Sequence, residues 1–429
     1  MYMVELIANV NNAINGFVWG VPMLVLLVGT GILMTILTKF FQLSHIGHWF
    51  KNTVGGIFHD QHVTKHTDAD DQSISQFQSL CTALAATIGT GNIVGVASAL
   101  VAGGPGAIFW MWIVAFFGMM TNYSENVLGI YYRRKNFKGE WSGGAMYYLK
   151  DGLGSYKGCK QIGAVLAVLF SAFCLLASFG IGNMSQVNSI AANMTSAFSI
   201  PATVTGIVLV IIGALVIVGG LKRIAAVTEK LVPFMAIAYV IGALVIFFAN
   251  IGHVGAVFTA IFKGAFGLRA VGGGIVGSGV KLALTWGMKR GVFSNEAGQG
   301  SSTMVHSQAH TNHPVRQGLW GMFEVFMDTM VVCSLMSLAI ILSGVWDSGV
   351  QGAALSVSAF GSVYGGLGAK LVAIAILLFG LTTQAGWFCY YDVLLRYFLK
   401  DNIALKNKIL KVFRYLYPVP GLLTILYTV

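Results

Sequence analysis

The chain has 429 residues, of which 56% are hydrophobic and only 10% are charged. Soluble globular proteins carry roughly 25% charged residues, so this composition excludes an ordinary water-soluble domain and indicates a membrane protein. The formal net charge of +11 needs no nucleic-acid partner, because the basic residues gather in a few short segments between apolar runs.

Ten apolar runs are long enough to cross a hydrocarbon layer about 30 Å thick as helices, which takes about 20 residues each. Helices are required because backbone polar groups in lipid must be satisfied within the segment. The sequence therefore predicts an all-α polytopic membrane protein. The predicted spans are 17–38, 78–101, 106–131, 162–195, 203–220, 231–250, 280–305, 319–343, 369–398 and 411–429.

The first run, 17–38, is predicted to remain in the mature protein as a span, followed by a cytoplasmic loop over 39–76. It lacks a basic n-region and is too long for the apolar part of a signal peptide. Basic residues recur in alternate connecting segments, whereas the turns at 102–105 and 196–202 carry no Lys or Arg. The positive-inside rule then places the N-terminus outside. The region 253–280 is predicted to be an external re-entrant or amphipathic segment.

A cluster of glycine and polar residues interrupts the second run over 87–95, TIGTGNIVG. Gly89 and Gly91 lower the helix propensity, and Thr90 and Asn92 bring neutral oxygens to membrane depth. We expect a break in the helix here. The alternative is a tight helix contact in which the hydroxyls bond to the preceding turn.

A second cluster lies in the seventh run over 290–302, RGVFSNEAGQGSS. Irregular backbone at membrane depth is tolerated only where it lines a protein cavity, and there half-helix ends can bind a carboxylate or a cation. The two clusters are five spans apart. This spacing fits two inverted repeats of five helices, predicted over 78–250 and 280–429.

Three acids fall inside predicted spans: Glu125, Glu324 and Asp328. Such acids are costly in a membrane and are usually functional. They could pair with Lys289 or Arg290, relay a proton, or add charge to an ion site. Internal ion pairing is the interpretation that we favour.

Three classes of membrane protein compete at this point. A channel needs a continuous polar lining or charged rings, and an intramembrane enzyme needs a nucleophile with a base or a set of metal ligands. The sequence offers neither. Two helix breaks at one depth favour a transporter with an occluded site, which is not an enzyme and needs no cofactor.

The segment 103–118, GGPGAIFWMWIVAFFG, resembles the signature of the alanine or glycine:cation symporter family. The segments 89–95 and 290–298 share this resemblance, which extends over nearly the whole chain. It implies a leucine-transporter-type fold, with the second and seventh spans as broken core helices and 17–38 as an extra N-terminal span. It also implies sodium-coupled symport of a small neutral amino acid, alanine or glycine, by alternating access in a bacterial inner membrane. A proton-coupled amino-acid permease of the same fold remains the alternative.

The resemblance also implies two sets of site residues, with sodium as the coupling ion. The backbone near Gly89 would receive the substrate carboxylate, and a small cavity would exclude branched side chains. The residues implied for substrate are Gly89, Thr90, Gly91, Asn183, Gln186, Phe293, Asn295 and Trp387. Those implied for sodium are Thr87 and Asn92 near the substrate, and Ala85, Ile88, Thr382 and Thr383 at a second position.

The apolar run 411–429 is not followed by a polar tail. With the second span numbered as core helix one, the resemblance implies that the tenth core helix is absent and that the second repeat, 280–429, is incomplete. We therefore expect residues 1–429 to transport poorly unless the missing helix is supplied.

Overall fold

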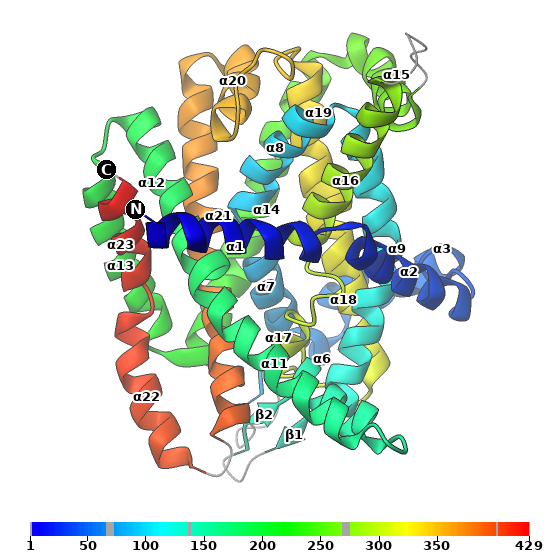
Figure 1. Ribbon diagram of the computed structural model, residues 1–429, viewed down its shortest axis with the longest axis vertical. Coiled ribbons are helices and arrows are strands. Elements are labelled where there is room, and N and C mark those ends of the chain that lie inside the picture. The colour runs from blue at the N-terminus through cyan, green and yellow to red at the C-terminus, as the bar shows by residue number, and fades with distance from the viewer. Residues whose placement is uncertain (1, 66–72, 136–138, 268–274, 400–401, 429) are drawn as a thin grey trace.

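The protein is described here by a computed structural model, which covers residues 2–65, 73–135, 139–267, 275–399 and 402–428. It is a bundle of helices, most of which follow the vertical direction of Figure 1. The only strands among these residues form one small antiparallel hairpin, β1 (Arg134–Lys135) and β2 (Trp141–Ser142). The predicted all-α fold is confirmed.

Each of the ten predicted spans coincides with a helix or with successive helices. Seven continuous helical stretches in the described part are long and apolar enough to cross a membrane, and one further pair is bent. The predicted spans 203–220 and 280–305 correspond to helices that do not meet this test. The seven stretches are Ala8–Leu37, Gly106–Tyr131, Lys160–Phe198, Gly220–Ala249, Pro314–Leu342, Gly366–Phe398 and Ala404–Leu426.

The segment before the first break lies on the outside of the bundle. α1 (Tyr2–Val18) runs across the front of the long helices, and α2 (Val21–Leu37) follows it. The predicted loop contains four short helices, α3 (Phe41–Ser44), α4 (Ile46–Asn52), α5 (Val54–His59) and α6 (Gln61–Thr64). Trp49 of α4 is buried, and its ring centroid lies 5.7 Å from that of Phe326. The loop therefore packs against a core helix.

The first half of the bundle begins at a capping box, in which Ser75 and Gln78 bond to each other's backbone. Its first elements are α7 (Gln76–Thr87), η1 (Thr90–Asn92), α8 (Val94–Gly103) and α9 (Gly106–Tyr131). Next come α10 (Ala145–Tyr147), η2 (Tyr148–Gly152), η3 (Leu153–Ser155), α11 (Lys160–Phe179), η4 (Gly180–Met184) and α12 (Ser185–Phe198). The half ends with α13 (Ala202–Ile217), α14 (Gly220–Ala249), η5 (Ile251–His253) and α15 (Val254–Phe266).

The second half begins with α16 (Ile275–Asn295) and α17 (Thr303–His306), followed by α18 (Pro314–Val325), the π-helix η6 (Phe326–Cys333) and α19 (Ser334–Leu342). It ends with α20 (Ala353–Tyr364), α21 (Gly366–Phe398), α22 (Ile403–Leu416) and α23 (Val419–Thr428). The helix α20 was not predicted. In the region 253–280, α15 is a helix, whereas Arg269 and the glycine run after it lie outside the described residues.

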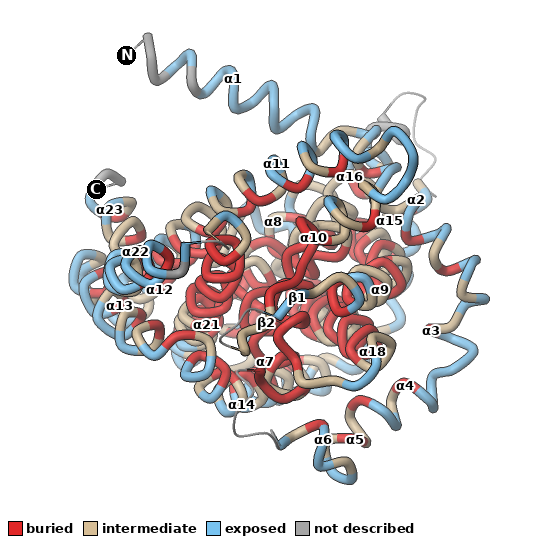
Figure 2. Tube along the Cα trace, turned by 90° about the horizontal axis from the view of Figure 1, so that it is seen from below, coloured by how far each residue is buried: buried red, intermediate tan, exposed pale blue. Residues whose placement is uncertain are grey.

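Figure 1 shows α7 below α8 but α16 above α17, so the two interrupted spans run in opposite directions. Antiparallel broken helices are expected of inverted repeats. Figure 2 shows that the buried residues concentrate in α7, α9, α18 and α21, while α1 is exposed. The core of the bundle therefore surrounds the interrupted spans.

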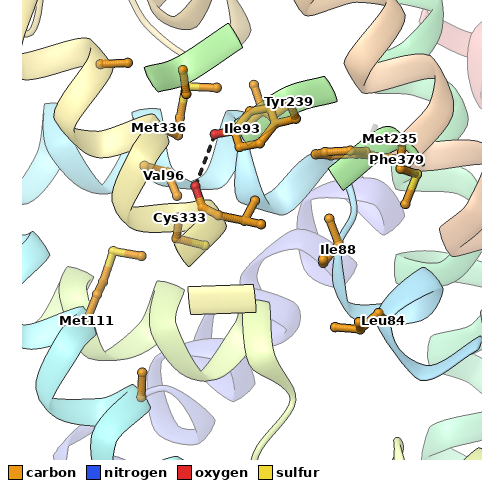
Figure 3. Packing of buried hydrophobic residues seen from close by; sticks show 14 of the residues in the cluster. Leu84, Ile88, Ile93, Val96, Met111, Met235, Tyr239, Cys333, Met336 and Phe379 are labelled. Carbon is orange, nitrogen blue, oxygen red and sulfur yellow. Dashed lines mark hydrogen bonds between the residues drawn. The ribbon is translucent and has the colours of Figure 1, made fainter. Parts of the chain in front are cut away.

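An apolar cluster holds the first interrupted span in place. Leu84 and Ile88 precede the interruption and Ile93 follows it, and all three point into the cluster in Figure 3. The ring of Tyr239 on α14 lies 5.5 Å from that of Phe379 on α21. Contacts of this kind, rather than exclusion of water, stabilise helix packing in lipid.

Candidate functional site

The second predicted span is broken at the predicted position. α7 ends at Thr87, α8 starts at Val94, and the two helices are bent by 60°. The backbone of Gly89 is extended, and its N–H donates to Oδ1 of Asn92 at 2.8 Å. Asn92 therefore supplies the acceptor that the interrupted helix no longer provides.

Two neighbouring helices bind the broken segment. The Thr90 N–H donates to Oε1 of Gln186 on α12 at 3.1 Å, and the Thr383 hydroxyl of α21, which bonds to the Phe379 carbonyl at 2.9 Å, also lies 3.3 Å from the Ile88 carbonyl. A Cβ added at Gly89 would lie 2.7 Å from Oγ1 of Thr383 and 3.2 Å from Oε1 of Gln186. Only glycine leaves room for these contacts.

The second interruption follows α16, which ends at Asn295. Glu296 has a φ of 56°, and Gly298 and Gly300 have φ values of 86° and 70°, so the chain turns through left-handed conformations that favour glycine. Oδ1 of Asn295 accepts the Ala297 N–H at 3.0 Å. The helix resumes only at α17, which confirms the predicted second break.

The two breaks meet at Asn92. Its amide donates to Oγ of Ser294 at 2.9 Å and to Oδ1 of Asp328 at 2.6 Å. The Ser294 hydroxyl donates to Oδ2 of Asp328 at 2.7 Å, and Asn295 donates to the Thr329 hydroxyl at 3.1 Å. All five side chains are buried. One hydrogen-bonded junction therefore joins α16, η1 and η6.

Among the described residues, the favoured ion pairing of the membrane acids is not seen with Lys289 or Arg290, but Glu324 contacts His306, a pair that is ionic when the imidazole carries a second proton. Asp328 bonds to neutral side chains, and Glu324 lies 3.0 Å from Nε2 of His306. Neither acid pairs with Lys289 or Arg290. The Arg290 guanidinium instead lies over aromatic rings, 5.8 Å from the centroid of Phe293. Neutral hydrogen-bond donors surround Asp328, and an imidazole and an amide contact Glu324.

The structure brings part of the implied substrate set together. Gly89, Thr90 and Gln186 are in mutual contact, as described above. A Cβ added at Gly91 would lie 3.5 Å from the ring of Phe293, so these two residues face each other across a narrow gap. Asn295 is at the same junction through its contact with Thr329, a residue of η6.

Asn183 and Trp387 have other surroundings. The Asn183 amide donates to the Tyr417 carbonyl, and its Oδ1 accepts from Gln384 at 2.8 Å. Trp387 packs against Gly182, where an added Cβ would lie 2.4 Å from Cβ of Trp387. These contacts join η4 to α21 and to the segment after α22.

The residues implied for sodium offer only oxygen atoms, the ligands that hard cations prefer. Ile88 and Thr383 are already in contact, and Ala85 lies within the last turn of α7. The Thr382 hydroxyl bonds to carbonyls of its own helix at 2.9 Å, and the Thr87 hydroxyl bonds to the Ala83 carbonyl at 3.3 Å. The side-chain amide of Asn92 is already hydrogen-bonded to Ser294 and Asp328 at the junction.

Sequence reasoning did not assign Ser294, Cys333 or Thr329 to the site, although all three lie at the junction. Ser294 stands directly before Asn295 inside the second cluster, so its position was a usable signal. Cys333 and Thr329 lie in η6, whose π-helical form shifts the register of the helix face, and an α-helical pattern does not anticipate that shift.

Comparisons with known proteins agree with this geometry. The profile of the sodium:alanine symporter family matches residues 4–427. The sodium/alanine symporter AgcS of Methanococcus maripaludis is 44% identical over 90% of this chain and 83% of its own length. A putative sodium/proton-dependent alanine carrier of Bacillus subtilis, YrbD, is 37% identical over 91% of this chain and 77% of its own length.

The fold also has a counterpart among solved structures. A Na⁺-coupled sialic acid symporter, in a substrate-bound outward-open state, superposes with a TM-score of 0.56 at 12% identity. The match covers 96% of this chain and 83% of that one. At this identity the likeness shows the fold alone, and that fold is the expected leucine-transporter type.

Proposed function

Because the chain belongs to the sodium:alanine symporter family, we propose that it couples the entry of sodium to the uptake of alanine or glycine by alternating access. Membership makes it a multi-pass membrane transporter and not an enzyme. The observation that most supports the proposal is the Asn92 junction, where both broken spans meet beside oxygen ligands.

The substrate carboxylate would bind at the first break. The Thr90 N–H is held by Oε1 of Gln186, an oxygen that occupies the place of a carboxylate oxygen. Substrate would displace this oxygen, so Gln186 would turn away when the site fills. Asn295 would help to hold the ammonium group. The narrow gap between Gly91 and Phe293 favours a hydrogen or methyl side chain and excludes branched ones.

Sodium would bind where α21 meets the first break. The Ala85 and Ile88 carbonyls with the Thr382 and Thr383 hydroxyls would form one position, and residues next to Asn92 a second. A cation there would stabilise the contact between the break and α21. Because substrate needs the same break, sodium would raise substrate affinity by linkage.

The proposed setting is a bacterial inner membrane, with lipid around the bundle and the N-terminus outside. The basic segments support this orientation through the positive-inside rule. Proton coupling is the alternative, and one observation favours it: the buried carboxyl group of Asp328 lies 2.6 Å from the amide of Asn92.

Alanine uptake into proteoliposomes, measured with the implied last core helix supplied and under an imposed sodium gradient and then a proton gradient, tests the proposal. We expect uptake to need sodium and to fall at least about tenfold in Thr383→Ala, which removes a proposed ligand worth about 1.5–3 kcal/mol in a contact to a charge. Thr30→Ala is the matched control, because the Thr30 hydroxyl bonds only within its own exposed helix. Uptake driven by protons without sodium would refute the proposal.

A further inference from the structure

A second polar region lies below the Asn92 junction, where α9 and α18 pack closely. Each helix presents three residues with i, i+4, i+7 spacing to the other, and both stripes are buried. A Cβ added at Gly321 would lie 1.9 Å from Nδ2 of Asn126, and one at Gly129 would lie 2.4 Å from Oγ1 of Thr303 on α17. The stripes are Asn122, Asn126 and Gly129 on α9, and Gln317, Gly321 and Glu324 on α18.

His306 of α17 connects the ends of the α18 stripe. Its Nδ1 lies 2.5 Å from Nε2 of Gln317, and its Nε2 lies 3.0 Å from Oε2 of Glu324. The Asn122 amide also donates to Oε2 of Glu324, at 2.9 Å. The side chains of His306 and Glu324 have no exposed surface. A short chain of contacts therefore runs from amide to imidazole to carboxyl group.

This polar region contains buried oxygen atoms that lack a hydrogen-bond partner. Four buried oxygens have no partner, one each on Asn126, Thr303, Gln317 and Glu324. Half a turn of the Gln317 amide would place its unpartnered Oε1 opposite Nδ1 of His306, a contact that needs a proton on Nδ1. At 2.5 Å that contact suits oxygen better than a second nitrogen.

The charged groups around Glu324 also favour a bound proton. An ionised carboxyl group is costly to bury without a full set of partners. Arg133 bonds to carbonyls just beyond α17, at Ser307 and Ala309. The carboxyl groups of Glu125 on α9, Glu296 after α16 and Asp328 on η6 interact electrostatically with Glu324, as does Tyr390 on α21.

We propose that His306 and Glu324 form a proton-binding site that holds one proton between them at neutral pH. The proton ties α17, the second half of a broken span, to α18. It sets the pH dependence of transport but is not the driving ion. The part of this inference that concerns transport rests on the proposed function.

Infrared titration of the purified chain tests the site without transport. We expect the wild type to show a protonated carboxyl band that is lost with rising pH, is absent in Glu324→Gln and titrates at a different pH in His306→Gln. Glu5→Gln, on the exposed α1, is the matched control and keeps the band. An unchanged titration in both variants, or in His306→Gln alone if Glu324→Gln does not fold, would overturn the inference.

Sodium-driven alanine uptake across the same pH range gives the second readout. The wild-type rate should fall at least about tenfold, equivalent to about 1.4 kcal/mol, as the carboxyl band disappears, whereas Glu324→Gln should change less than about twofold. Equal pH profiles would overturn the inference. A wild type without sodium-driven uptake would instead refute the proposed function, and the infrared titration would still decide on the proton site.

Discussion

Replacing Gly89 by alanine is the most direct test of the first break. The added Cβ would lie 2.7 Å from Oγ1 of Thr383 and 3.2 Å from Oε1 of Gln186. Overpacking costs about 1–3 kcal/mol, and displacing the two hydrogen bonds to Ile88 and Thr90 costs about 1 kcal/mol each. A total of about 3–5 kcal/mol corresponds to a loss of about a hundredfold or more in affinity.

The assay is sodium-dependent alanine uptake, with apparent affinities measured for both sodium and alanine. We expect both to weaken in Gly89→Ala, because one break serves both ligands. Gly180→Ala is the control: Gly180 begins η4, and an added Cβ there meets nothing within 4 Å. If Gly89→Ala transported like Gly180→Ala, the close contact with α21 would have no part in binding, and our reasoning about this site would fail.

Three further substitutions test other contacts. Asn92→Ala leaves the Gly89 N–H unpartnered at about 1–3 kcal/mol, so the sodium requirement should rise at least fivefold in an uptake titration; an unchanged requirement would count against the junction. Gly182→Ala places a Cβ 2.4 Å from Cβ of Trp387 and should destabilise the protein by about 1–3 kcal/mol, measured as a lower Tm in detergent; an equal Tm would contradict this packing. Trp49→Ala empties a buried contact with η6, at about 3–5 kcal/mol, and should speed proteolysis of the loop; equal cleavage rates would show that the loop does not depend on it.

Much of the architecture could be predicted because glycine and polar residues are rare inside apolar runs. The clusters around Gly89 and Gly298 mark both interruptions, and the bend of 60° lies where the first cluster does. The length of the apolar runs likewise predicted the positions of the long helices. The helix α20 was missed because it is short, and glycines at 352 and 365 flank it.

The partners of the acids could not be predicted, because they depend on distant parts of the chain. Asp328 contacts Asn92 across more than two hundred residues, and Glu324 contacts Asn122 over a similar separation. Ion pairing with Arg290 was the natural expectation from charge alone. Periodicity cannot show that amides and hydroxyls would contact Asp328, or that an amide and an imidazole would contact Glu324.

The thiol at the junction provides a native reporter of access to the core. Sγ of Cys333 lies 3.3 Å from the Asn92 amide, and the residue is buried and unpaired. A membrane-impermeant alkylating reagent can reach this sulfur only when a water-filled path opens as far as Asn92. The wild-type sequence therefore carries a chemical label site whose reaction rate, from either side of the membrane, measures how often the path to the broken helices is open.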